Sequence, residues 1–170
     1  MDHLRIYMDD QLALGVLWRE MARRSAGANR GTAAGDALTR VAGAIAEDVA
    51  TFESLMDRLG FERGPTTTAK TLAATAAERI GRLKLNGQLR GYSPLSRFEE
   101  LDFLTMGIAG KRQLWATLRD LAGLAQRFPD VDFDGLIRRA EQQQAELEPH
   151  RQQAGREALG VGDVRVETPT

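Results

Sequence analysis

The sequence predicts an all-α protein, an antiparallel four-helix bundle of two helical hairpins with a long crossover that contains a short extra helix. Along four long stretches apolar residues recur three and four positions apart, which is the period of one helix face. No segment shows the period of two that indicates a half-buried strand. We therefore expect a single bundle domain over residues 1–160 and a disordered tail over 161–170.

Composition excludes several classes of function. The 170 residues are 42% hydrophobic and 28% charged, with a net charge of -1. Such a chain has no overall field to attract nucleic acid or an anionic membrane, so we expect neither partner. The absence of cysteine excludes disulfides, thiolate metal sites and cysteine nucleophiles. No apolar run approaches the roughly 20 residues of a membrane span, and the acidic first residues do not suit a signal peptide, so we expect a cytoplasmic protein.

The first hairpin is expected to consist of helices over about 2–26 and 35–59, because only a short glycine-containing turn separates them. The second of these helices repeats its apolar residues at close to 3.5 positions, as a bundle helix does. The first helix has more apolar residues than one seam needs, and the surplus predicts a homodimer interface. The residues that suggest this interface are Leu12, Val16 and Trp18.

The crossover is expected to hold an alanine-rich helix over 69–84 and a loop over 86–94. Basic residues gather around Tyr92 in this part of the chain and form a candidate anion-binding patch. The alternative is that they are solvated helix charges paired with nearby acids such as Glu78 and Glu99. The patch residues are Arg79, Arg82, Lys84, Arg90 and Arg97.

The second hairpin contains the strongest helical pattern of the chain, over 98–127. We expect its helix to start at Pro94 or, with Glu99 completing a capping box, at Ser96, and Pro129 should end it. Asp132 is placed to cap the last helix, because aspartate accepts hydrogen bonds from the free N–H groups of a first turn. Pro149 lies within the pattern of that last helix, and we expect it to kink or end the helix before Gly160.

A layer of polar side chains interrupts these apolar faces. Lys111 falls where the rhythm of its helix calls for an apolar residue, and its neighbours on the helix surface are apolar. Its ammonium either extends to water along the helix or is paired inside the core. The other long helices also place polar residues in their apolar faces; the alternatives are a solvated bundle edge for the aspartates and ordinary helix surface for the glutamines. The expected central layer is Asp10, Asp48, Lys111, Gln143 and Gln144.

Two segments resemble the ferritin-like four-helix-bundle superfamily, in particular bacterial stress-associated ferritin-like proteins. Tyr7 is followed three residues later by Asp10, matching a tyrosine and a ligand glutamate in the first helix of that family. The segment 51–60, TFESLMDRLG, is similar to the end of its second helix. The resemblance implies a site built from carboxylates of all four helices with two Glu-x-x-His pairs, which together bind two iron ions.

This chain differs from that family at the residues that would bind metal, and these differences determine the function that we expect. The chain has no Glu-x-x-His pair, Lys111 stands where the third core helix carries an acid, and Gln143 and Gln144 replace acids of the last helix. A cation and two amides do not form a site for hard metal ions. We therefore expect no cofactor and a non-catalytic, metal-free bundle that acts as an interaction or scaffold protein for a protein partner that the sequence does not identify.

Two alternatives remain open. One is a degenerate ferritin-like protein that binds iron or manganese, or an oxidase, with a ligand set drawn from several helices. That set is Asp10, Asp48, Glu47, Glu100 and His150. The other alternative makes the polar layer the wall of a pocket for a small anion or another small molecule between the helices.

Overall fold

The computed structural model describes residues 2–61 and 92–160, and every regular element within these ranges is helical. The all-α prediction is therefore confirmed for this part of the chain. The expected helix over 69–84, most of the expected loop and the tail over 161–170 lie outside the described residues. The elements in chain order are α1 (Asp2–Ala28), α2 (Ala33–Arg58), α4 (Pro94–Ala116), η1 (Thr117–Leu121), α5 (Leu124–Arg127) and α6 (Phe133–Leu159).

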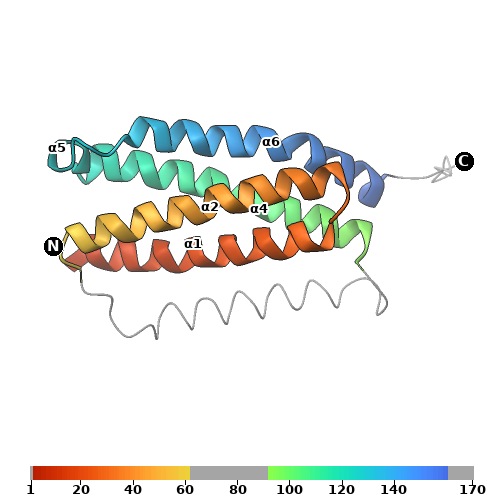
Figure 1. The fold of residues 1–170 in the computed structure, drawn as a ribbon, viewed down its shortest axis with the longest axis horizontal. Helices are drawn as coiled ribbons and strands as arrows, with labels where there is room; N and C mark the ends of the chain where they lie inside the picture. Colours follow the sequence, from red (N-terminus) through yellow and green to blue (C-terminus); the bar gives the residue numbers. More distant parts are fainter. Residues whose placement is uncertain (1, 62–91, 161–170) are drawn as a thin grey trace, which may run out of the picture.

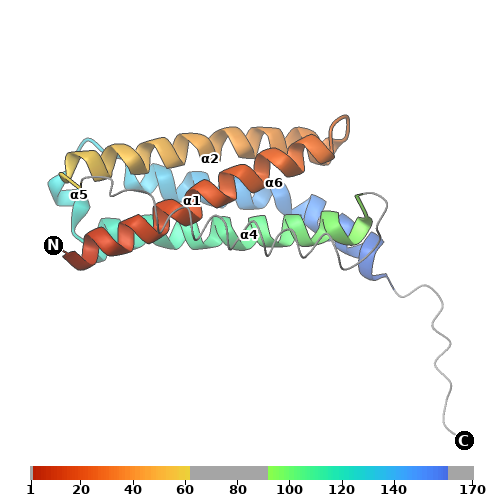
Figure 2. The ribbon, with the colours of Figure 1, turned by 90° about the horizontal axis from the view of Figure 1, so that it is seen from below.

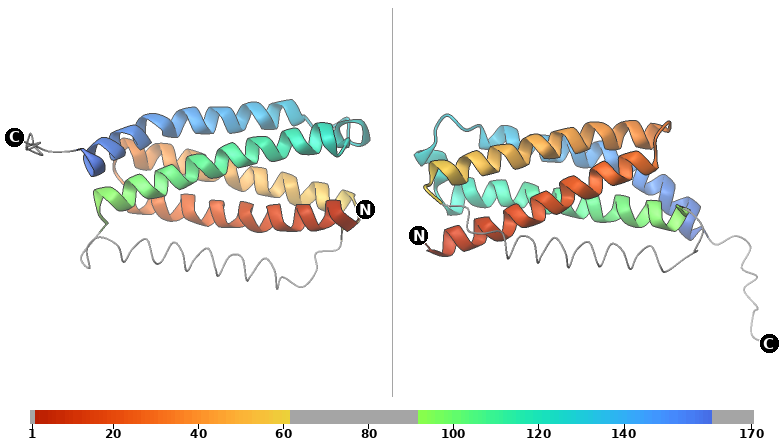
Figure 3. Two further views of the ribbon diagram at one scale, coloured as in Figure 1. Left: turned by 180° about the vertical axis from the view of Figure 1, so that it is seen from behind. Right: turned by 60° about the horizontal axis from the view of Figure 1, so that its bottom comes forward.

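The long helices lie side by side as two antiparallel pairs (Figure 1). One pair is α1 with α2 and the other is α4 with α6, and the two pairs meet where α1 packs on α4 and α2 packs on α6. The views in Figures 2 and 3 show that α2 and α4 run in the same direction. None of the helices in the two described ranges is long and apolar enough to cross a bilayer.

The turn between α1 and α2 is built from local hydrogen bonds. Gly31 takes a positive φ of 81°, a conformation that glycine adopts without steric cost. Thr32 then caps α2, because its side-chain oxygen accepts a hydrogen bond from the backbone N–H of Gly35 at 3.0 Å. This cap starts α2 at Ala33, two residues before the start that the sequence pattern predicts.

The apolar interior forms two clusters along the length of the bundle. The first lies toward the α1–α2 turn and includes Leu38, Ile45, Leu104 and Ile108. The second lies toward α5 and is richer in aromatic rings. Its centre is Trp115, whose ring meets those of Phe52 and Phe133 edge to face, with centroids 5.8 and 6.5 Å away.

The long helix of the second hairpin begins at Pro94, one of its two expected starts, but it is not continuous to Pro129, so its expected end was wrong. The α-helical part, α4, ends at Ala116 and continues as one wider π-helical turn, η1. The backbone N–H of Ala122 bonds the carbonyl of Thr117 at 3.0 Å, which closes that turn. Gly123 then takes a φ of 64° and breaks the helix before α5.

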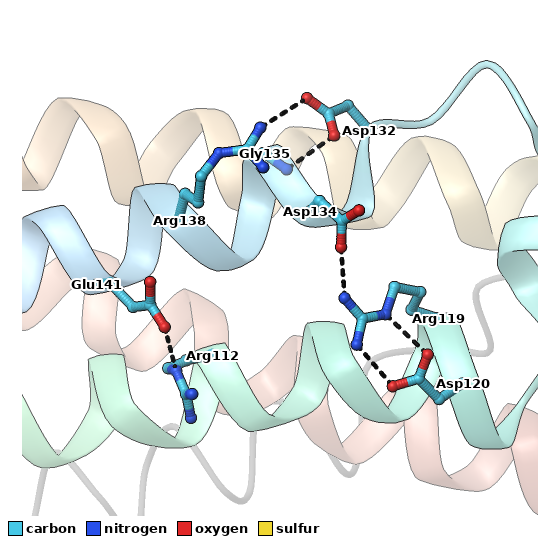
Figure 4. Close-up of polar contacts among 8 residues, drawn as sticks. All are labelled: Arg112, Arg119, Asp120, Asp132, Asp134, Gly135, Arg138 and Glu141. Atoms are coloured by element: carbon cyan, nitrogen blue, oxygen red, sulfur yellow. Dashed lines mark hydrogen bonds and ion pairs between the residues drawn. The ribbon is translucent and has the colours of Figure 1, made fainter.

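The last helix follows the sequence-based expectation closely. Asp132 caps α6 by accepting a hydrogen bond from the N–H of Gly135 at 2.8 Å (Figure 4). Pro149 lies inside α6 without ending it, and Figure 1 shows the helix bending in its C-terminal half. Figure 4 also shows Arg112 of α4 bound to Glu141 of α6 at 2.8 Å, one of the ion pairs on the surface of this hairpin.

The contact between the two hairpins depends on a glycine. A Cβ atom placed on Gly107 of α4 would lie 2.6 Å from the ring of Trp18 on α1, which is closer than real side chains pack. The indole therefore rests directly on the backbone of α4. Gly110, one turn away on the same helix, has no atom within 4 Å of the corresponding position.

These two glycines give a matched test of the packing of α1 on α4. Gly110→Ala should raise the free energy of unfolding by about 0.5–1 kcal/mol, because alanine favours the helix and meets no atom. Gly107→Ala gains the same propensity but must displace Trp18, and overpacking of this kind costs about 1–3 kcal/mol. In chemical denaturation the free energy of unfolding of Gly107→Ala should therefore be at least about 1 kcal/mol lower than that of Gly110→Ala. Equal stabilities would contradict the close contact.

Candidate functional site

Asp48 is the centre of the polar layer. It lies on the inner face of α2 with 2% of its surface exposed. Its Oδ2 accepts hydrogen bonds from the ammonium of Lys111 on α4 and from Nε2 of Gln143 on α6, the latter at 3.2 Å. Its Oδ1 accepts a hydrogen bond from Nη2 of Arg139, also on α6. One buried carboxylate therefore joins three helices.

Lys111 is paired inside the bundle rather than extended to water, since its side chain is only 14% exposed. Besides its bond to Asp48, the ammonium donates a hydrogen bond to Oε1 of Gln143. Burial lowers the pKa of Lys111, because the charged form loses its hydration. The charge of Asp48 and its hydrogen bond act in the opposite direction, and the nearby Arg139 lowers this pKa further.

Arg139 is the member of the layer that sequence reasoning missed. Its guanidinium spans the edge of the bundle, with Nη2 on the buried Asp48 and Nη1 on Glu47 at 3.2 Å. Glu47 points outward, with 70% of its side chain in water. A signal was available in the sequence, because Arg139 precedes Gln143 by four residues and therefore shares its helix face.

The structure brings together Asp48, Lys111 and Gln143, but it does not bring Asp10 or Gln144 into the layer. Asp10 is exposed on α1, and Gln144 is half-buried without a hydrogen bond to the layer. Their inclusion was therefore wrong. The cause on α1 is its rotation, which buries Met8 and leaves the apolar Ile6 53% exposed.

The alternative metal ligands do not converge. Glu47 lies on the outer side of Arg139, and His150 is half-buried farther along α6.

Glu100 belongs to a separate polar cluster, in which it accepts hydrogen bonds from Arg24 and from the hydroxyl of Tyr92, each at 3.0 Å. Within residues 2–61 and 92–160 no three His, Cys, Asp or Glu side chains are grouped so that they could hold a metal ion.

The second polar cluster includes part of the candidate anion-binding patch. The pKa of Tyr92 is raised, first by burial and then by the negative charge of Glu100, and Asn29 donates a hydrogen bond to its hydroxyl at 2.8 Å. Arg97 pairs with Glu157 at 3.3 Å and lies over the Tyr92 ring, 5.9 Å from its centroid. Within the described residues Arg97 therefore has an acidic partner. The other patch residues, Arg79, Arg82, Lys84 and Arg90, lie outside the described residues.

A cavity of about 360 Å³ lies between α1, α2 and α4, beside the polar layer of Asp48, Lys111, Gln143 and Arg139. Most of its wall is apolar, and Asp48, Lys111 and Gln11 are its polar or charged side chains apart from the indole nitrogens. The wall also includes both tryptophans of the chain, Trp18 and Trp115. Three further wall residues have exposed side chains: Leu14, Phe103 and Met106. The arrangement is an apolar space with one cationic group at its side.

Comparison with known proteins adds no assignment. No protein-family model, no curated protein and no solved structure matches this chain.

The contacts of the polar layer predict how much each substitution in it lowers the free energy of unfolding. Asp48→Asn leaves the buried Lys111 without its counter-ion, and breaking a buried pair in this way costs about 3–5 kcal/mol. Lys111→Met should cost less, about 1–3 kcal/mol, because Arg139 still neutralises Asp48. The double mutant should show a coupling energy of about 0.5–3 kcal/mol in chemical denaturation at pH 7.

The control for this series is Asp10→Asn, which removes an acid that the sequence placed in the layer but the structure leaves exposed. It should change the free energy of unfolding by no more than about 0.5 kcal/mol. If Asp48→Asn were as mild as Asp10→Asn, the layer would contribute nothing to the fold.

Proposed function

We propose that the protein is a non-catalytic, metal-free ferritin-like four-helix bundle that binds a small, mostly apolar molecule between its helices. The observation that carries this proposal is the cavity of about 360 Å³ that reaches the polar layer. Sites for small molecules have volumes of about 300–1,000 Å³, apolar walls and a few polar groups that orient the ligand. This cavity has all three properties.

The chemistry of the layer supports binding rather than catalysis by a metal pair. A di-iron site of the ferritin-like type needs several carboxylates that bridge and charge-balance two cations. Here the one carboxylate at the centre, Asp48, already bonds Lys111 and Arg139, two cations supplied by the protein itself. A metal ion at this position would be repelled by both, so the donor set does not fit the metal.

The alternative proposal, a degenerate iron- or manganese-binding protein or oxidase, is tested by metal content. We expect the chain purified without chelator to carry far less than one equivalent of iron, manganese or zinc by elemental analysis, and to consume no oxygen when iron is added. Stoichiometric metal whose removal lowers stability would contradict the metal-free proposal and favour the alternative.

The cavity itself is tested with a neutral fluorescent probe, N-phenyl-1-naphthylamine. Because Trp18 and Trp115 line the cavity and are the only tryptophans of the chain, energy transfer from tryptophan to the probe reports binding there. We expect saturable binding of one equivalent. Leu14→Trp should weaken it at least about tenfold, because an indole at this wall position fills part of the space needed by the probe.

The matched control is Ile6→Trp, which puts the same side chain at an exposed apolar position of α1 outside the cavity wall. It should leave the affinity for the probe unchanged. If the unaltered chain does not bind the probe, or if Leu14→Trp binds it as well as Ile6→Trp, the cavity is not a binding site.

A scaffold function with a homodimer interface is the second candidate. The residues first expected to form that interface, Leu12, Val16 and Trp18, pack at least partly against the chain's own core. The observation that favours a partner is instead the exposure of Met106, at 61%, with Phe103 and Leu14 near it around the cavity. The homodimer stays a prediction that a measurement of molar mass in solution decides.

A further inference from the structure

The polar end of the cavity identifies the chemical class of its ligand. We infer that the cavity takes an organic monocarboxylate with an apolar body, whose carboxylate accepts the remaining N–H of Lys111. This inference rests on the proposed binding function. It goes beyond that function because it assigns a charge, a head group and a contact atom to the ligand.

The first argument is the count of donors on Lys111. An ammonium group has three N–H donors. Within the described residues, two of them are used, one on Asp48 and one on Gln143. The side chain lines the cavity, so the remaining donor is next to the space that a ligand would fill. A carboxylate there would form a charge-assisted hydrogen bond, which is stronger than a neutral one.

The second argument is that the charged groups of the lining leave a donor free but no acceptor. Both oxygens of Asp48 already accept hydrogen bonds, from Lys111 and Gln143 on one oxygen and from Arg139 on the other. Lys111, by contrast, keeps one N–H without an acceptor among the described residues. A ligand that brings acceptors complements this lining, whereas a ligand that brings an ammonium group does not.

The third argument is the local charge. Asp48 carries one negative charge and is bonded to two cations, Lys111 and Arg139. Glu47 pairs with the outer side of Arg139, but 70% of its side chain is in water, which screens its charge from the cavity. Among the described residues Lys111 therefore shares its one anionic partner with Arg139, and a carboxylate on the cavity side would add a second anion beside its ammonium.

The apolar body follows from the rest of the wall. Leu12, Val49, Phe52 and Ile108 offer hydrocarbon and ring surface, with no further charged side chain in the lining. A hydrophilic anion such as phosphate or sulfate would leave this surface in contact with water. A carboxylate attached to a hydrocarbon chain or ring gains from burying it.

The test uses three ligands that share one hydrocarbon chain and differ only in the head group: octanoate, octanamide and octylamine. Binding to the full chain at pH 7 is measured by calorimetry and by tryptophan fluorescence, since both tryptophans line the cavity. We expect the Kd of octanoate to be at least about tenfold lower than that of octanamide, because the negative charge of the carboxylate adds to the hydrogen bond that either head group accepts from Lys111. Octylamine should bind most weakly.

Lys111→Met should remove the preference, so that octanoate binds no more tightly than octanamide. The matched control is Arg112→Met, which removes the same charge from the next residue of α4. The guanidinium of Arg112 faces Glu141 on the surface (Figure 4). Arg112 is not among the residues that line the cavity. This control should keep the preference for octanoate, and circular dichroism should show that both variants are folded.

The outcomes separate the two proposals. If none of the three ligands nor the neutral probe binds, the proposed binding function fails. If octanamide or octylamine binds as tightly as octanoate, the cavity is a binding site but the assignment of a carboxylate ligand is overturned. A preference for octanoate that survives in Lys111→Met would also overturn it. Should Lys111→Met not fold, the ranking of the three ligands on the unaltered chain still decides.

Discussion

The structure depends on one buried carboxylate. An ionised group with 2% exposure is stable only if cations and donors surround it, because the cost of burying an unpaired charge exceeds the stability of a whole domain. Asp48 meets this requirement through Lys111 of α4 and through Arg139 and Gln143 of α6. These contacts fix the positions of the three helices relative to one another along the bundle axis. The two apolar clusters lie largely on either side of the layer. We infer that the layer sets the axial register of α2, α4 and α6.

The fourth long helix, α1, contributes no charged group to this layer, and Asp10 faces water. Its contact with α4 includes Trp18, whose ring rests on the backbone of Gly107. Beside that contact the part of the chain that the structure describes leaves a mostly apolar cavity between α1, α2 and α4. The layer thus presents Lys111 to an apolar space, which is the combination on which the proposed binding function rests.

The members of the layer could be predicted from the sequence where they interrupt a regular apolar helix face. Lys111 and Asp48 interrupt regular apolar faces, so their burial and their mutual contact were within reach of periodicity. Asp10 was placed wrongly because apolar residues lie on several sides of α1, and the pattern did not fix its rotation. Arg139 reads as a surface residue and reaches Asp48 only through its long side chain. The cavity depends on how side-chain volumes meet across three helices, which no single helix pattern encodes.

The layer requires Lys111 to be a buried, hydrogen-bonded ammonium, and nuclear magnetic resonance of its side-chain nitrogen observes that group itself. The chain has three lysines, Lys70, Lys84 and Lys111, so labelling lysine with ¹⁵N gives three signals that single substitutions assign. Because Lys111 is enclosed and bonded to Asp48 and Gln143, we expect its N–H protons to exchange slowly enough with water to be observed at neutral pH, with cross-relaxation to the side-chain amide of Gln143. An ammonium of Lys111 that exchanged freely with water and showed no contact with Gln143 would contradict this account.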